Sequence, residues 1–597
     1  MTRVEDEVTA IPVPARRGFT FPWALALPLI LLWALTALIY LDGLRHQHGH
    51  FIYCLDDAYI HMAMAKHFAQ EGVWGVTRDG FTSSASSLLW PLCIAGVFRI
   101  IGPHVFVQFW LNLLISSGIV IIAYRLLRRQ GLSAPFTAVA LALLIVAMPL
   151  PTMIFTGMEH CLQALVVMLF IYVAGEVLAV DSFSLSFSLS NKVNHPQDST
   201  RGSARQPSLK KIEKDNENEK GKEITGEGEP GGVVWYLYLL APLLTLVRFE
   251  GMLLAAVACV LLLLRRKPWS AVIVGVGALL PVAVYAWISI AHGWLWMPNS
   301  VLLKGNTPHL ASLHGLASLA VTFAKRIFTV PGVRQVLLLT LGTYLANGAR
   351  TRRWWSGDQC RVLLFLCLLF LHGLTAGNPV FFRYEAYLVA VGVFVVAVPL
   401  GKLVIAWWPR ATSRADLYRG AAVLIALLAM IDLANSRGVY GLLLTPQAST
   451  NIYRQQIQMA RFIARYYPGT VIAANDIGAI NYFADIHCVD LAGLASMPAA
   501  RRMKQHTLSQ AAMAEVCRDA NVKIAIFYLR WFPTPPTNWI CVSKWVMDNN
   551  VVCGDAVVYF YAVDPTEAAP LAAHIKEFRT QLPDGEAVYM FRLPHAK

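Results

Sequence analysis

Hydrophobic residues gather in long runs, separated by short polar stretches, over the first 435 positions of the chain. A helix needs about 20 apolar residues to cross a bilayer. Runs near that length lie at 21–41, 104–124, 134–155, 161–180, 270–291, 384–401 and 418–434. Shorter runs lie at 233–247, 250–264, 333–347 and 360–376. The pattern therefore predicts a polytopic α-helical membrane protein with about eleven transmembrane helices.

One further run, 86–101, is ambiguous because it contains Pro91 and Arg99. If this run crossed the membrane, the basic clusters at 125–129, 265–267 and 350–353 would all face outward. If it lies along the outer interface, these clusters and the one at 410–414 all face the cytoplasm, as Lys and Arg normally do. We therefore expect a non-spanning segment, an N-terminus inside and a C-terminus outside.

The pair of runs 233–247 and 250–264 could also form one over-long helix. That helix would bury Arg248 and Glu250 in hydrocarbon at a cost of several kcal/mol. Two short helices that meet at the outer face are the better interpretation.

Polar and mixed segments divide the rest of the chain. We expect a cytoplasmic segment at 1–20, a transmembrane domain at 21–435 and a first external loop at 42–103. Residues 181–232 are rich in Ser, Lys, Glu and Gly, which predicts a disordered cytoplasmic loop. From 436 to 597, strand-like stretches such as "VKIAIFYL" alternate with helical ones. This alternation predicts an extracytoplasmic α/β domain.

Composition agrees with a membrane protein. Of 597 residues, 56% are hydrophobic and 14% are charged, with a formal net charge of +14. Such values are rare in soluble chains of this length. The basic residues are scattered between apolar runs and form no patch interleaved with aromatic residues. We therefore expect no nucleic-acid partner.

Ten cysteines are spread along the chain. Those in apolar runs are expected to pack as small hydrophobic residues. Four fall in the C-terminal domain, where an oxidising compartment would favour disulfides. We predict a disulfide between Cys541 and Cys553, and a second between Cys488 and Cys517. Their spacing suggests no zinc site.

The predicted topology places ionisable and polar residues from five distant segments at the outer face. Such groups are costly near a bilayer and usually have a function. The candidates are Asp56 and Asp57 in "CLDDAYI", Glu159 in "TGMEH", Arg248 and Glu250 in "VRFEG", Asn299 and Lys304 in "PNSVLLK", and Arg383 and Tyr384 in "FRYEAY". Their convergence indicates a site at this face.

Each candidate also has a simpler interpretation. Asp56 can be the N-cap of a helix at 57–70. Arg248, Arg383 and Lys304 can be interfacial side chains that extend toward water. Glu159 can pair with a neighbouring base. Capping explains one aspartate, however, and does not require two.

A carboxylate beside cationic groups at this face suits sugar transfer from a lipid-linked phosphate. The carboxylate can take the proton of an attacking hydroxyl. The cations can stabilise the departing phosphate. A second acid beside the first would raise one pKa by repulsion, or would orient the acceptor.

The segment "DDAYIHMAMAKHFAQEGVWG", with the later "GFTSSASSLLWPL", resembles the first-loop signature of bacterial GT-C fold glycosyltransferases, especially the cell-wall arabinofuranosyltransferase-like group. "TGMEH", "VRFEG", "PNSVLLK" and "FRYEAYL" are similar to later landmarks of that group, in the same order. The usual Arg-Pro-Glu-Gly is here Arg-Phe-Glu-Gly, and the Thr/Ser stretch is longer, as "TSSASS".

The resemblance implies an inverting glycosyltransferase of a bacterial inner membrane with a periplasmic site. In it, Asp56 would be the general base, with Asp57 beside it, and the helices at 57–70 and 86–101 would lie along the membrane. The donor would be a polyprenyl-phosphate sugar, and the acceptor a glycan, a lipid or a protein of the cell envelope. A metal cofactor is not favoured. The alternatives are a transporter of lipid-linked sugars and a catalytically silent glycan-binding membrane protein.

Overall fold

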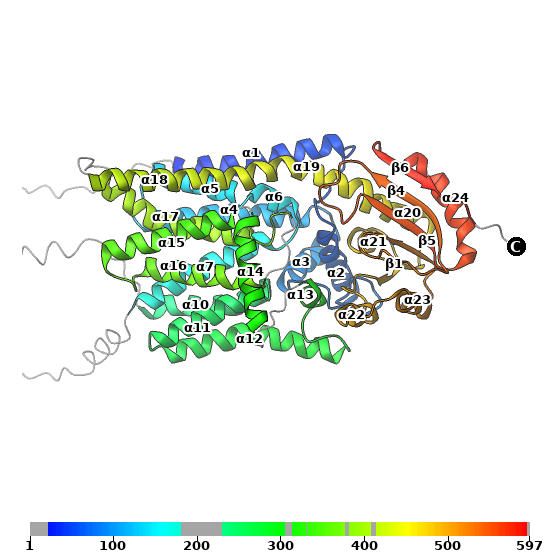
Figure 1. Cartoon of the computed structure of the whole chain (residues 1–597), viewed down its shortest axis with the longest axis horizontal. Helices are drawn as coiled ribbons and strands as arrows, with labels where there is room; N and C mark the ends of the chain where they lie inside the picture. Colours follow the sequence, from blue (N-terminus) through cyan, green and yellow to red (C-terminus); the bar gives the residue numbers. More distant parts are fainter. Residues whose placement is uncertain are drawn as a thin grey trace, which may run out of the picture.

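The computed structural model describes residues 22–180, 230–304, 313–330, 332–375, 381–407 and 414–593. It has two parts, a long bundle of helices and a C-terminal α/β domain at one end of that bundle (Figure 1). The predicted disordered segment 181–232 falls almost entirely outside the described residues.

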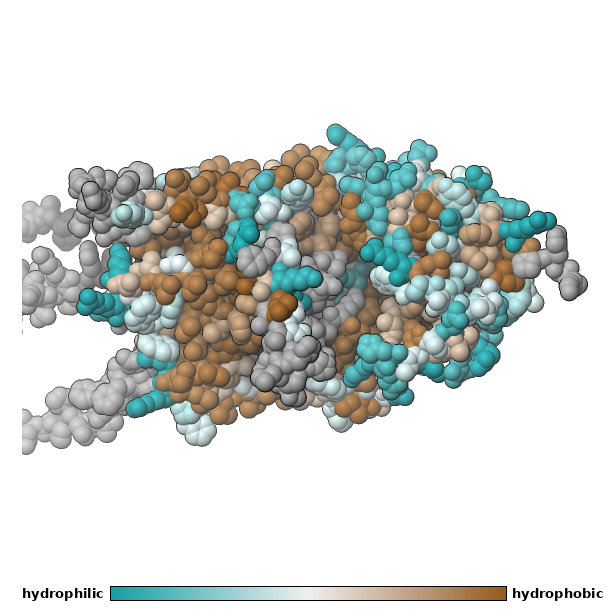
Figure 2. Space-filling view, viewed as in Figure 1, coloured by the Kyte–Doolittle hydropathy of each residue, from teal (hydrophilic) through white to brown (hydrophobic). Residues whose placement is uncertain are grey.

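Each of the eleven predicted apolar runs contains a bundle helix. They are α1 (Trp23–His46), α4 (Val107–Arg129), α5 (Ala134–Ala147), α7 (His160–Ala179), α10 (Pro230–Val247), α11 (Gly251–Leu264), α12 (Pro268–Ala291), α15 (Val333–Thr351), α16 (Gly357–Thr375), α17 (Ala386–Trp407) and α18 (Arg414–Leu433). Within the described ranges, seven helical stretches are long and apolar enough to cross a membrane, and α5, α10 and α11 are apolar but shorter. Figure 2 shows the hydrophobic surface concentrated over the bundle and the hydrophilic surface over the C-terminal domain. The chain is a polytopic helical membrane protein with a C-terminal α/β domain.

The run 134–155 is not one straight helix. Helix α5 ends at Ala147, and a short helix, α6 (Leu150–Phe155), follows. Pro149 and Pro151 lie at the start of α6, where each lacks the amide hydrogen that a continuous helix requires. After the break, α6 packs against α1, α4 and α19 (Tyr440–Ile452), and the chain then reaches Glu159.

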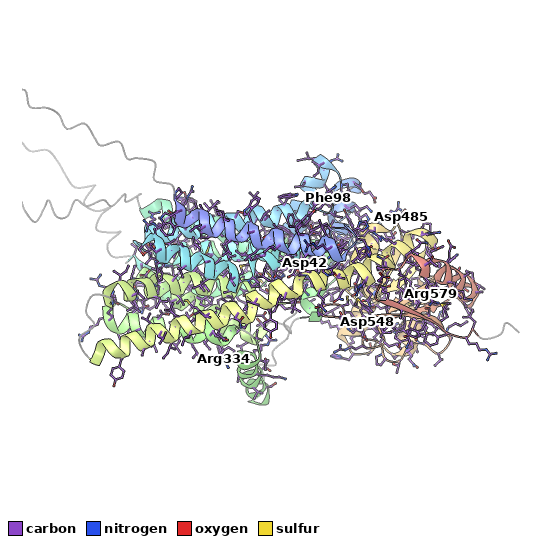
Figure 3. All side chains as sticks on the ribbon, turned by 90° about the horizontal axis from the view of Figure 1, so that it is seen from above. Asp42, Phe98, Arg334, Asp485, Asp548 and Arg579 are labelled. Carbon is purple, nitrogen blue, oxygen red and sulfur yellow. The ribbon has the colours of Figure 1, made fainter. Side chains whose placement is uncertain are left out.

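Four helices lie at or near the end of the bundle that carries the C-terminal domain. They are α2 (Asp57–Glu71), α3 (Leu89–Ile101), α13 (Asn299–Lys304) and α14 (Leu313–Thr329). Helix α3 has 13 residues and would be about 20 Å long, too short to cross a bilayer. Helix α14 runs across the bundle axis and projects sideways near Arg334 (Figures 1 and 3).

The predicted basic cluster at 265–267 lies at the opposite end of the bundle, beside the end of α7. Arg265 Nε and Lys267 Nζ donate to the carbonyls of Leu178 and Val177 at the end of α7, over 3.0 and 2.6 Å. The Arg265 guanidinium also lies 5.3 Å from the ring centroid of Trp355, before α16. These basic side chains therefore lie at the end of the bundle away from the C-terminal domain.

A continuous helical run joins the two parts. It starts at Arg414 in α18 and passes through a π-helical turn (Ala434–Val439), α19 (Tyr440–Ile452) and a second π-helical turn (Tyr453–Ile457). It ends with α20 (Gln458–Tyr466). The predicted domain boundary at 436 thus falls inside a helix.

The C-terminal domain contains a six-stranded sheet in the order β2-β1-β3-β5-β4-β6. Its strands are β1 (Val471–Ala474), β2 (His487–Asp490), β3 (Ile524–Phe527), β4 (Ile540–Met547), β5 (Val557–Ala562) and β6 (Glu586–Met590). Strands β2, β1 and β3 are parallel, whereas β5, β4 and β6 pair antiparallel. Helices α21 (Gly478–Phe483), α22 (Met497–Lys504), α23 (Gln510–Asp519) and α24 (Ala568–Phe578) pack around it.

The two predicted disulfides are wrong, because all four cysteines are free. Cys541 lies near the start of β4, whereas Cys553 follows its end and donates from Sγ to Gln456 Oε1 at 3.3 Å. The intervening strand separates them by about 20 Å. Cys488 and Cys517 pack into the cores on opposite faces of the sheet.

Candidate functional site

Asp56 and Asp57 lie where the bundle meets the C-terminal domain. Asp56 directly precedes α2, yet its side chain makes no capping hydrogen bond to that helix. Asp56 thus occupies the predicted N-cap position, but its side chain does not cap the helix. Its carboxylate turns instead toward the C-terminal domain.

There, Asp56 Oδ2 and Oδ1 accept hydrogen bonds from the amides of Gly478 and Ala479, at 2.7 and 2.8 Å. These amides belong to the first turn of α21, whose unpaired N–H groups favour a negative charge. Glycine is needed at 478, because a Cβ there would lie 2.1 Å from the Asp56 carbonyl oxygen. The contact fixes the C-terminal domain onto the start of α2.

A third carboxylate, Asp476, faces Asp56 from the loop after β1. Burial raises the pKa of Asp56 to about 8, with a further contribution from the negative charge of Asp476. Asp476 Oδ2 accepts hydrogen bonds from Gln456 Nε2 at 2.8 Å and from the Tyr528 hydroxyl. Asp56 can therefore gain or lose a proton near neutral pH, unlike an ordinary exposed aspartate.

Asp57 forms an ion pair with Arg383, in the loop before α17. Arg383 is 5% exposed, and its guanidinium carbon lies 5.0 Å from the ring centroid of Tyr384. Asp57 and Arg383 are 326 positions apart in the sequence. The predicted convergence of the first loop and "FRYEAY" is therefore real.

Arg248 and its two carboxylate partners form a second ionic group. Arg248 Nη1 lies 2.5 Å from Glu159 Oε1, and its Nε lies 3.1 Å from Glu250 Oε2. The chain reverses between α10 and α11 at these residues, as the two-helix interpretation predicted. Gly251 permits the tight turn, since a Cβ there would lie 2.4 Å from the Leu244 carbonyl oxygen.

Glu159 has no exposed surface. Burial alone would raise the pKa of Glu159, but Arg248, with His61 and His160, outweighs it and lowers the pKa to about 2. Ser86 Oγ donates to Glu159 Oε1 at 3.1 Å. Glu159 is therefore a permanent anion that holds Arg248 in place.

A cavity of about 330 Å³ lies against these two ionic groups. Its ionisable lining side chains are Asp57, His61, His160, Arg248, Glu250, His372 and Arg383. Its apolar lining includes Phe249, Met252, Leu253, Met297, Val301 and Leu302. Because Asp57 and Glu250 balance the two arginines, a phosphate here would depend on directed donors rather than on net charge.

Several buried polar atoms beside this cavity have no hydrogen-bond partner among the described residues. They include Arg383 Nε, Ser300 Oγ, His372 Nε2 and both ring nitrogens of His160. Buried polar groups are normally paired, and an unpaired one costs about 1–3 kcal/mol. These atoms could bind the oxygens of a polar ligand.

Two predicted residues lie elsewhere or cannot be placed. Asn299 is fully buried, and its Nδ2 donates to the Gly493 carbonyl at 2.8 Å, which ties α13 to the C-terminal domain. It does not line the cavity. The side chain of Lys304 falls outside the described residues. Tyr384, in contrast, lines the cavity.

A second cavity, of about 470 Å³, lies between α2 and the C-terminal domain. It is lined by Asp56, Asp57, Ile60, Leu303, Asn475, Asp476, Ile477, Ala492, Leu494, Met503, Trp531 and Phe532. Asp57, Ile60 and Leu494 line both cavities. The paired aspartates thus stand where the two cavities meet.

The sequence prediction missed His372 and Asp476. His372 lines the first cavity from α16, and its Nδ1 lies 3.1 Å from the Tyr387 hydroxyl. An ionisable residue within an apolar run often indicates a functional site, and His372 in "FLHGL" is such a residue. Asp476 follows a strand of another domain, and no local pattern connects it to Asp56.

Comparisons with known proteins leave the family open. Residues 450–561 match a family model described as "Domain of unknown function (DUF8728)". No curated protein matches the chain. Among solved structures, the crystal structure of ArnT from Cupriavidus metallidurans in the apo state is similar at 12% identity, with a TM-score of 0.43, over 90% of this chain and 98% of that one.

Proposed function

We propose that the protein is a membrane glycosyltransferase of the GT-C type that uses a polyprenyl-phosphate sugar. The main support is the cavity beside Asp57, where apolar walls meet buried guanidinium groups and unpaired donors. A lipid-linked phosphate has the same combination of an apolar tail and an anionic head. The resemblance of the landmark motifs to the arabinofuranosyltransferase-like group agrees with this proposal.

In the proposed reaction, an acceptor hydroxyl attacks the anomeric carbon of the donor sugar from the face opposite the phosphate. A bond forms between the hydroxyl oxygen and that carbon, and the bond from carbon to phosphate oxygen breaks. The proton passes to the Asp56 carboxylate, and polyprenyl phosphate leaves with the electron pair. Arg383, oriented by Asp57, and Arg248, held by Glu159, stabilise the negative charge that develops. The anomeric centre is inverted.

We assign the end that carries the C-terminal domain to the outer, periplasmic side of a bacterial inner membrane. Support comes from the basic residues at the opposite end of the bundle, where cytoplasmic loops normally carry Lys and Arg.

Purified protein in detergent separates this proposal from a transporter of lipid-linked sugars. A transferase needs no membrane compartments, so it should release undecaprenyl phosphate from an undecaprenyl-phosphate pentose or hexose when envelope glycan is added. A transporter would bind the donor and leave it intact. In cells, mass spectrometry of envelope glycans with and without the gene should show the loss of one sugar.

Loss of Arg383 should weaken donor binding. Arg383→Gln removes a charge-assisted contact, and we expect the Kd for undecaprenyl phosphate to rise roughly 10- to 100-fold. Lys304→Ala should weaken binding as well. Native mass spectrometry would measure both, with Arg78→Gln, an exposed arginine paired with Asp485, as the control. An unchanged Kd in both test variants would remove these residues from the phosphate site.

The rate of transfer should depend on pH through Asp56. Below about pH 8 the protonated carboxyl cannot accept the hydroxyl proton, so kcat/KM should rise with pH and level off above that value. Asp476 and Asp57 face Asp56 with like charge, and Tyr59 and Tyr528 are buried phenols that stay neutral. Asp476→Asn removes one negative neighbour and should move the midpoint to lower pH. A midpoint that stays in place would argue against Asp56 as the titrating base.

A further inference from the structure

The second cavity lies at a distinctive place in the C-terminal sheet. Asn475 and Asp476 follow β1, Ala492 and Leu494 follow β2, and Trp531 and Phe532 follow β3. All three strands are parallel, so these residues gather at the carboxyl ends of the strands. In open α/β sheets, ligands bind in the crevice outside this edge.

The strand order sharpens this location. Strand β1 lies between β2 and β3, so the chain leaves β1 toward one side of the sheet and later returns to pair with its other side. The strand order therefore reverses between β1 and β3, where such sheets form a ligand crevice. Asn475 and Trp531 flank this crevice, from the loops after β1 and β3.

The side chains of the crevice suit a polyhydroxylated ring. The indole of Trp531 is 46% exposed and packs edge-on against Tyr528, with ring centroids 5.5 Å apart. Phe532 adds a second aromatic wall. Three carboxylates, Asp56, Asp57 and Asp476, can accept hydroxyl hydrogens.

One donor is also available. Asn475 is 5% exposed, its Oδ1 accepts from the Tyr528 amide at 3.2 Å, and its Nδ2 has no partner among the described residues. A buried amide without a partner carries a free-energy cost that a ligand oxygen would remove. Aromatic faces, acceptors and one donor together match the alternating C–H and O–H groups of a sugar.

We propose that this crevice binds the acceptor as a carbohydrate, with one hydroxyl directed at the two aspartates at the boundary between the cavities. The inference rests on the proposed transferase function and names its acceptor class. The C-terminal domain then supplies half of the reaction chamber. Trp531 and Asn475 act as residues that position the acceptor.

Binding of short neutral oligosaccharides to the full-length protein in nanodiscs tests this assignment. The probes are pentose and hexose oligomers of four to six units, measured by saturation-transfer NMR. We expect at least one probe to receive saturation on its ring protons. Trp531→Ala should weaken its binding about tenfold or more, whereas Trp531→Phe should retain most of it. Tyr589→Ala, an exposed aromatic of the same domain outside the cavity, is the matched control.

Asn475→Asp gives a second variant of nearly equal size that loses the free donor and should also weaken binding. Undecaprenyl phosphate binding, measured on the same samples, reports the donor cavity separately. The acceptor assignment would be overturned if no oligosaccharide binds, or if oligosaccharide binding is unchanged in both test variants. This holds even if undecaprenyl phosphate still binds. Binding of a serine-containing pentapeptide in place of every oligosaccharide would also overturn it. If the wild-type protein does not bind undecaprenyl phosphate, the proposed transferase function is contradicted instead.

Discussion

Asp56→Asn should lower kcat by about 10²- to 10⁴-fold, the range that a general base contributes. Asparagine has nearly the same size and can still accept a hydrogen bond from Gly478 or Ala479 through its Oδ1. It cannot, however, take the proton of the acceptor hydroxyl. The measurement is the release of undecaprenyl phosphate from a sugar-loaded donor.

Donor binding should survive in Asp56→Asn, because Asp56 lines the second cavity and does not line the first. Asp485→Asn, an exposed aspartate of the C-terminal domain paired with Arg78, is the control and should keep full activity. Transfer at the normal rate by Asp56→Asn would end its assignment as the base, and Asp57 would then be the next residue to examine.

Arg248→Met should produce the largest loss of stability. The substitution leaves Glu159 without its closest cation at a site with no exposure to solvent. Breaking such a buried pair costs about 3–5 kcal/mol. We expect a clear drop of the thermal unfolding temperature in detergent, together with weaker donor binding.

The double variant Arg248→Met/Glu159→Gln separates structure from function. With no unpaired charge at position 159, most of the lost stability should return. Donor binding should stay weak, because the guanidinium is still absent. A double variant that remains as unstable as Arg248→Met would show that Arg248 stabilises the fold mainly through Glu250 or through packing.

The membrane part of the fold could be predicted from the sequence because a bilayer imposes a simple rule on each segment. Every spanning helix must be apolar along its own length, so local composition locates α1, α12 and α17 without knowledge of their neighbours. The break after α5 was missed, because Pro149 and Pro151 lie inside a run that is apolar throughout.

The candidate site could be predicted only in part. The ionisable residues at the ends of apolar runs were found because such groups are rare and costly there, and Asp57, Arg248 and Arg383 do line one cavity. The pairing of each carboxylate with its cation depends on how the helices pack. This packing cannot be predicted from composition.

The contacts of the C-terminal domain were beyond prediction. Asp56 binds amides 422 and 423 positions away, and two potential disulfides fail because a strand or a sheet separates the cysteines. Sequence spacing says little about distance across a mixed sheet. The wrong disulfides and the unexpected partner of Asp56 have this same cause.

The uninterrupted helix from the bundle into the C-terminal domain has a mechanical consequence. Its stretch Gly420–Tyr466 has 47 residues, contains one segment apolar enough to cross a membrane, and would extend about 70 Å, more than twice the thickness of a hydrocarbon core. A rod of this length converts a small change of tilt into a larger displacement at its far end. Bilayer thickness influences such tilts, so lipid chain length should change the gap between the sheet edge and the two aspartates, and with it the rate of the proposed transfer.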